Sequence, residues 1–248
     1  MTPEELVARA CPKIGALGSA FYFVPETVAA GAALGLDVFQ FYFLGRGGVL
    51  GDVEPRVVAS AFGYFEPSLV EMMWNAARAK AAPREAGRAH LAACQSFGRA
   101  HLGDLPGLGA FCESAEAVVA AADPAGLALY SGISAEALPD DLPARAMQLV
   151  AVLREYRGSA HLVAVIASGL EPRIAHYLRR PADLGLFGWP AEPPPEVTDS
   201  DRRALADADA LTDKLVLSGY GVLDGPGREA LVAGVDQIES ALSGPGSV

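Results

Sequence analysis

Residues 143–168, PARAMQLVAVLREYRGSAHLVAVIAS, determine how the rest of this chain can fold. Aliphatic side chains fall on nearly every side of the helix that this stretch predicts, which is typical of a helix enclosed by other helices. The stretch also carries Arg154, Glu155, Arg157 and His161. Because burying a guanidinium group without a partner is costly, these charges are predicted to be paired inside the protein or to line a cavity.

Three basic side chains share one stripe of this predicted helix. At about 100° per residue, Arg157 and His161 fall within about 60° of Arg154, and Gly158 leaves a gap beside them. The pattern leaves three alternatives open. The stripe can belong to a structural salt-bridge network, to a ligand or catalytic site, or to an ordinary exposed face.

An acid that neutralises the stripe is predicted to come from another part of the chain. Glu155 faces away from the stripe on the helical projection, so Glu26 and Asp37 are the candidate partners. A ligand sulfate, phosphate or carboxylate held by bidentate arginine geometry would serve equally well. Arg46, in LGRGGVLG (44–51), is a further arginine that we expect to be buried, in a loop that lacks the ending of a P-loop.

Shorter helices are predicted on both sides of the central one. Residues 25–34, 37–44 and 54–65 form a helix-turn-helix pattern, residues 68–122 are Ala-rich and helical, and 123–142 are predicted to be a loop with a short extended piece. Near the C-terminus, a helix over 200–218, an extended hairpin over 219–227 and a helix over 228–242 outline half a winged helix. We therefore predict a mostly α fold with winged-helix or helix-turn-helix-like units at both ends, joined by a helical middle region and divided into 1–142 and 143–248.

The composition limits the compartment and the partners. A net charge of −11 opposes nucleic-acid binding, which draws much of its affinity from clustered cations. Three cysteines without a CxxC pair, no export-signal pattern and no uncharged run near the ~18 residues of a membrane helix favour a cytoplasmic protein. Because hydrophobic residues make up 51% of the chain, we expect a homo-oligomer or a hetero-oligomer with a second biosynthetic subunit.

Five motifs follow one another in a recognisable order. They are YFVPE (22–26), FYFLGRGGVLG (41–51), FGYFEP (62–67), LREYRGSAHLVAVIASGLE (153–171) and GW (188–189). In these motifs the chain resembles the actinobacterial SalK-like helix-turn-helix family, whose series runs roughly YFAPE, YFAGRAAPLG, FYNFAP, LREHRGDGH with a following AGL, and RGW. The resemblance implies a mostly helical protein with winged-helix-like units at both ends, in a family with several members among natural-product biosynthetic genes.

The positions that match the family series are Glu26, Arg46, Arg154, Glu155, Arg157 and His161. The chain departs from the series at Tyr156, where the family has His, and at Ser159 and Ala160, where it has Asp-Gly.

The residues and the resemblance together predict a small-molecule-binding protein, specifically a biosynthetic enzyme of natural-product metabolism. Buried Arg and His would hold an anionic group of the substrate while a carboxylate base promotes elimination or cyclisation, a lyase or cyclase reaction without a redox cofactor. The predicted substrate-binding residues are Tyr22, Tyr42, Arg46, Arg154, Tyr156 and Arg157. The predicted catalytic residues are Glu26, Glu155 and His161.

No cofactor and no metal ion are predicted. GxSxG, Walker and Rossmann patterns are missing, and His90 and Cys94, with His101 nearby, lack the clearer spacing of zinc sites. Two alternative functions stay open. The first is a winged-helix transcriptional regulator, although the candidate recognition helix EPRVVASAFGYF (54–65) offers only Arg56 to DNA. The second is a non-catalytic protein that sequesters the same anionic ligand.

Overall fold

The computed structural model describes residues 1–103 and 105–243, so residues 244–248 of the predicted C-terminal unit lie outside the described residues. Every regular element of the described part is a helix and none is a strand, which confirms the predicted mostly α class. Its elements are α1 (Pro3–Leu17), α2 (Pro25–Ala33), α3 (Val38–Gly47), η1 (Gly48–Leu50), α4 (Pro55–Phe62), α5 (Pro67–Arg78), α6 (Pro83–His101), α7 (Leu108–Ala121), α8 (Ala128–Ser134), α9 (Leu142–Ala167), α10 (Pro172–Arg179), η2 (Pro181–Asp183), α11 (Asp199–Tyr220) and α12 (Gly225–Leu242).

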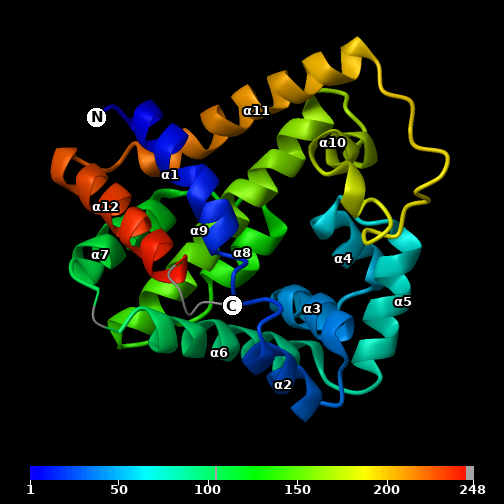
Figure 1. The fold of residues 1–248 in the computed structure, drawn as a ribbon, viewed down its shortest axis with the longest axis horizontal. Helices are drawn as coiled ribbons and strands as arrows, with labels where there is room; N and C mark the ends of the chain where they lie inside the picture. Colours follow the sequence, from blue (N-terminus) through cyan, green and yellow to red (C-terminus); the bar gives the residue numbers. More distant parts are fainter. Residues whose placement is uncertain (104, 244–248) are drawn as a thin grey trace.

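The helix predicted over 143–168 is α9, and it runs through the middle of the molecule (Figure 1). It begins where the side chain of Asp141 accepts a hydrogen bond from the backbone N–H of Ala144, and it ends before Gly169, whose φ of 70° suits glycine. Helices α1, α6, α7, α8, α10 and α11 pack against it. The expectation that other helices enclose this segment is therefore confirmed.

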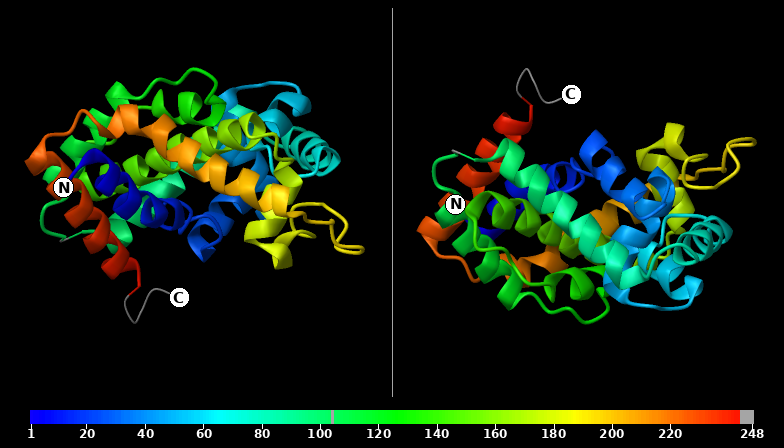
Figure 2. Two further views of the ribbon diagram at one scale, coloured as in Figure 1. Left: turned by 90° about the horizontal axis from the view of Figure 1, so that it is seen from above. Right: turned by 90° about the horizontal axis from the view of Figure 1, so that it is seen from below.

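The described part has two main hydrophobic cores, and α9 belongs to the first of them. The first joins α1, α7, α11 and α12 with α9 from Ala146 to Ala160, and the other is the aromatic core of α3, α4 and α5, built around Phe43, Phe62 and Trp74. Figures 1 and 2 place α1 and α12 at one end of the molecule and α4 and α5 at the other. Helix α6 approaches α9 closely because Gly98 has no side chain, and a Cβ there would lie 2.4 Å from the carbonyl oxygen of Pro143.

The hairpin predicted over 219–227 is wrong, because a tight turn joins α11 directly to α12. Asp224 caps α12 by accepting a hydrogen bond from the backbone N–H of Gly227 at 2.8 Å, and Pro226 lies in the first turn, where a missing N–H costs nothing. The DGPG sequence therefore starts a helix here. The extended piece predicted within 123–142 is also wrong, since α8 occupies Ala128–Ser134 and buries Leu129 and Tyr130.

The apolar composition of α2 and α3 raises the question of a membrane span. Among the described residues, no single helix is long and apolar enough to cross a membrane. The segments Pro25–Ala33 and Val38–Leu50 satisfy that criterion of length and composition only as a pair, with a bend of 82° between them.

Candidate functional site

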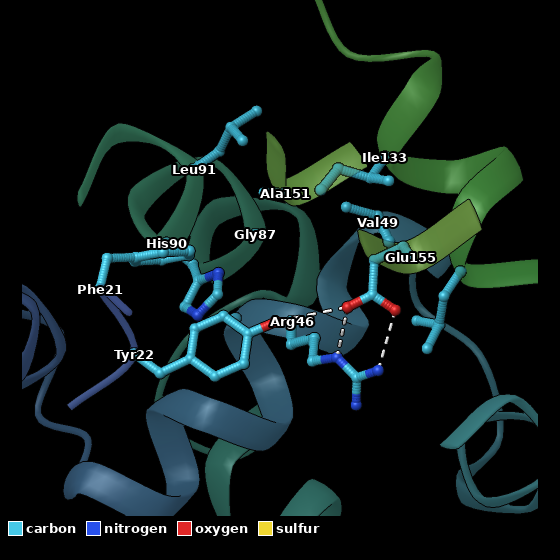
Figure 3. Close-up of a pocket in the computed structure, with 12 residues that line it drawn as sticks. Phe21, Tyr22, Arg46, Val49, Gly87, His90, Leu91, Ile133, Ala151 and Glu155 are labelled. Carbon is cyan, nitrogen blue, oxygen red and sulfur yellow. Dashed lines mark hydrogen bonds and ion pairs between the residues drawn. The ribbon is translucent and has the colours of Figure 1, made fainter. Parts of the chain in front are cut away.

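Glu155 lies in the enclosed part of α9 and accepts hydrogen bonds from three side chains. Arg46 contacts the carboxylate twice, with Nε 2.8 Å from Oε1 and Nη2 2.9 Å from Oε2 (Figure 3). Arg154 donates from Nη1 to Oε1 at 2.7 Å, and the Tyr22 hydroxyl donates to the same oxygen at 3.3 Å. The bidentate contact is the strong form of a guanidinium–carboxylate pair. We call Tyr22, Arg46, Arg154 and Glu155 the core charge cluster.

Helix α3 delivers Arg46 to this cluster from the aromatic core. The helix begins at a capping box between Asp37 and Gln40 and carries Arg46 in its last turn. The guanidinium lies 4.5 Å from the centre of the Phe62 ring, and its Nη1 donates to the Tyr42 hydroxyl at 3.1 Å. A ring face and a fixed hydroxyl therefore hold Arg46 in the orientation that meets Glu155.

The segment before α2 brings Tyr22 to α9. Gly18 makes this approach possible, because a Cβ there would lie 2.7 Å from the Cβ of Arg154. The Arg154 guanidinium in turn lies 5.2 Å from the centre of the Tyr22 ring. Three separate segments, residues 18–22, α3 and α9, thus meet at one carboxylate.

The cluster holds more positive than negative charge. Burial would raise the pKa of Glu155, but the charges of Arg46 and Arg154 outweigh it and lower that pKa to about 2. Burial disfavours the charged form of Arg46, and Glu155 nevertheless raises the pKa of that guanidinium. All three groups are therefore ionised at neutral pH. Among the described residues, two guanidinium groups share one carboxylate.

A small cavity of about 20 Å³ lies beside the cluster and is lined by Tyr22, Arg46 and Glu155, by His90 and by apolar side chains. Figure 3 shows the His90 imidazole next to the Tyr22 ring. His90 is buried, and its Nε2 has no hydrogen-bond partner among the described residues. A cavity needs a volume of roughly 10–15 Å³ to hold one water molecule, so this cavity accommodates a group of about the size of one hydroxyl.

One turn further along α9, a second group of charges faces α11. Arg157 donates from Nη1 to Oδ1 of Asp213 at 2.7 Å, and the side chain of Asp213 is 50% exposed. His161 Nδ1 lies 3.0 Å from the Thr212 hydroxyl and 3.9 Å from Oδ1 of Asp209. We call Arg157, His161, Asp209 and Asp213 the peripheral charge cluster.

The predicted stripe of basic residues therefore divides in two. Arg154 turns toward Tyr22 and Glu155, whereas Arg157 and His161 turn toward α11. The prediction that Glu155 faces away from the arginines is wrong. The long Arg154 side chain folds back onto its neighbour in sequence, and Arg46 reaches the carboxylate from another helix.

The predicted acid partners Glu26 and Asp37 are wrong as well, because both side chains are exposed and Asp37 caps α3. Among the predicted substrate-binding residues, Tyr22, Tyr42, Arg46 and Arg154 meet at the core cluster. Tyr156 lies elsewhere, with its ring against Tyr130 and Tyr220 and its hydroxyl directed at backbone carbonyls of α11.

His90 is the member of this site that the sequence did not identify. It stood out only as a weak metal candidate with Cys94, and no group of three His, Cys, Asp or Glu that could hold a metal ion occurs in the described part of the chain. Nearby glycines were the available signal. Gly45 allows α3 to approach α6, because a Cβ there would lie 2.8 Å from the Cβ of His90.

A family model described as a helix-turn-helix family matches residues 7–186. No curated protein and no solved structure matches the chain.

Proposed function

The chain belongs to the helix-turn-helix family, and from that premise we propose that it is a SalK-like member that binds a small organic anion at the core charge cluster. The observation that carries the proposal is the sharing of one buried carboxylate by two guanidinium groups. A buried excess of positive charge is unfavourable unless an anion compensates it. A ligand carboxylate, phosphate or sulfate would restore the balance.

Arg154 is the residue that we assign to the ligand. Its side chain is 23% exposed, compared with 4% for Glu155, so an anion can approach it from solvent. Glu155 is the acceptor for one of its N–H groups, and Arg guanidinium groups bind carboxylate and phosphate oxygens through two donors. Arg46, held by Glu155 and Tyr42, then acts by adding positive potential behind Arg154.

The geometry favours binding as the primary activity, with catalysis as an extension of it. An elimination or cyclisation in natural-product biosynthesis would have its developing oxyanion stabilised by Arg154 and Arg46. Glu155 is a weak base because the two arginines lower its pKa to about 2. In this proposal Glu155 therefore positions the arginines, and a base would come from the substrate or from another residue.

The compartment and the assembly are part of the proposal. Three free, buried cysteines support a cytoplasmic location. Exposed Phe23, Val28 and Phe39, which lie on and around α2 and α3, support the expected homo- or hetero-oligomer. Sedimentation at several protein concentrations tests the assembly, and a monomer at every concentration would contradict it.

A transcriptional regulator is the second candidate, and the family match is the observation that favours it. The exposed cations of the helix-turn-helix region include Arg56 on α4 and Arg78 on α5, and Arg78 lies 3.5 Å from Asp52. Fluorescence anisotropy with a random-sequence duplex tests this function. Tight binding that weakens steeply as salt rises would favour the regulator, and the anion-binding proposal predicts none.

Titration with sulfate, phosphate and propionate, followed by NMR, tests anion binding directly. We expect the wild type to bind at least one of them, and Arg154→Gln to weaken that binding at least tenfold. Arg88→Gln is the matched control, because Arg88 is an exposed arginine on the neighbouring helix α6. Equal binding by the two variants, or no binding by the wild type, would contradict the proposal.

A further inference from the structure

His90 has a polar atom that the fold does not use. The side chain is 7% exposed, and no described residue forms a hydrogen bond with its Nε2. Its ring is fixed by Phe21, Tyr22 and Phe41, whose ring centres lie 4.9, 5.4 and 5.5 Å away. A buried nitrogen without a partner lowers stability, and a phenylalanine would fill the same aromatic surroundings without that penalty.

The unpartnered nitrogen belongs to a side chain that lines the cavity beside Arg46 and Glu155. The remaining lining is mostly apolar. Its uncharged polar side chains are His90 and Tyr22, and the Tyr22 hydroxyl already donates to Glu155. The cavity volume of about 20 Å³ accommodates one hydroxyl-sized group.

Burial keeps the His90 imidazole in its neutral form. Burial lowers the pKa of His90 to about 3, with a further contribution from Arg46, so the ring is neutral at neutral pH. A neutral imidazole carries one N–H donor and one acceptor nitrogen. When the proton is on Nδ1, the unpartnered Nε2 is the acceptor.

We propose that His90 determines which anions the site prefers, by accepting a hydrogen bond from a ligand hydroxyl that enters the cavity. The ligand class is then a hydroxylated organic acid, with its acid group on Arg154 and its hydroxyl on Nε2 of His90. This inference rests on the proposed anion-binding function. It adds a requirement that the arginines cannot impose, because guanidinium groups only donate hydrogen bonds.

The experiment compares lactate with propionate, two acids that differ by one hydroxyl, by NMR titration at pH 7. The wild type is expected to bind lactate at least tenfold more tightly than propionate. His90→Phe is expected to bind both acids equally and to melt at or above the wild-type temperature. His90→Gln, which retains a hydrogen-bonding side chain, is expected to keep part of the preference and serves if His90→Phe fails to fold.

His176→Phe is the matched control. His176 is another buried histidine whose Nε2 has no partner among the described residues, and it packs against Phe187 instead of lining the cavity beside Arg46. This variant is expected to keep the wild-type preference for lactate. Equal binding of both acids by the wild type, or a preference that persists in His90→Phe, would overturn the role of His90 and leave anion binding intact. If the wild type bound none of the four anions (lactate, propionate, sulfate and phosphate), the anion-binding function itself would be overturned.

Discussion

Arg154 and Arg157 lie one turn apart on α9, and each pairs with an acid, yet the two clusters they form differ in burial and in charge balance. The core cluster places two guanidinium groups on Glu155, whose side chain is 4% exposed. In the peripheral cluster, Arg157 is the one cation paired with Asp213 among the described residues, and the side chain of that acid is 50% exposed. Only the core cluster combines buried charge with an excess of cations.

The difference shows that the residue types along a helix do not determine how much each charged side chain contributes to the free energy of unfolding. An exposed ion pair contributes little because water screens it and both side chains lose freedom. A buried pair is costly to form, and removing one partner leaves the other charge in a poor environment. The core cluster should therefore dominate the effects of mutation on stability, and the following experiments test that ranking.

Glu155→Gln should give the largest effect. It leaves the half-buried Arg46 and Arg154 without a carboxylate, and the free energy of unfolding should fall by about 3–5 kcal/mol. Asp213→Asn, the equivalent change in the peripheral cluster, should cost less than about 1 kcal/mol because the site is exposed. Urea denaturation measures both. Equal losses in the two variants would remove the distinction between the clusters.

The second-largest difference should be in how the stability of the two sites responds to acid. The folded-state pKa of His90 is about 3, below its ordinary value of 6.5, and that of Glu155 is about 2, below 4.5. The free energy of unfolding is therefore highest above the unfolded-state pKa of each group. It falls as the pH drops through 6.5 toward 3, where folded His90 resists protonation, and through 4.5 toward 2, where folded Glu155 resists it.

His90→Phe removes the first of these losses. As the pH falls from 7 to 4.5, the unfolding free energy of the variant should rise relative to the wild type by up to about 2–3 kcal/mol. His161→Phe in the peripheral cluster should show a smaller change. Burial lowers the pKa of His161 while the nearby Asp209 raises it. Denaturation curves at several pH values provide the comparison, and parallel curves for His90→Phe and the wild type would show that His90 is not buried in its neutral form.

The smallest effect belongs to the pair of Arg157 and Asp213. A double-mutant cycle with Arg157→Ala and Asp213→Ala should give a coupling energy of about 0.2–1 kcal/mol that shrinks as salt is added. Thermal or chemical denaturation of the four proteins measures it. A coupling of several kcal/mol would mean that the peripheral pair is protected from solvent in the assembled protein.

The sequence predicted α9 nearly to the residue, because helix formation depends on local periodicity and on local end signals such as Asp141 and Gly169. It failed at 219–227 because Asp-Gly and Gly-Pro occur both in hairpin turns and at helix starts. Leu223 and Leu231 are buried in the same core, and that packing favours the helix. His90 was missed because nothing adjacent to it in sequence indicates an unpartnered nitrogen.

The sequence by itself determined a mostly helical protein with an enclosed central helix that carries charge in its apolar surroundings. Only the tertiary structure decided which acid meets which cation. Glu155 and Arg46 are 109 positions apart, and a helical projection contains no information about a side chain that arrives from another helix. Periodicity reports the direction in which each Cβ points from its own backbone. The pairing of buried charges depends instead on how closely the helices pack and on how far the long arginine side chains can turn.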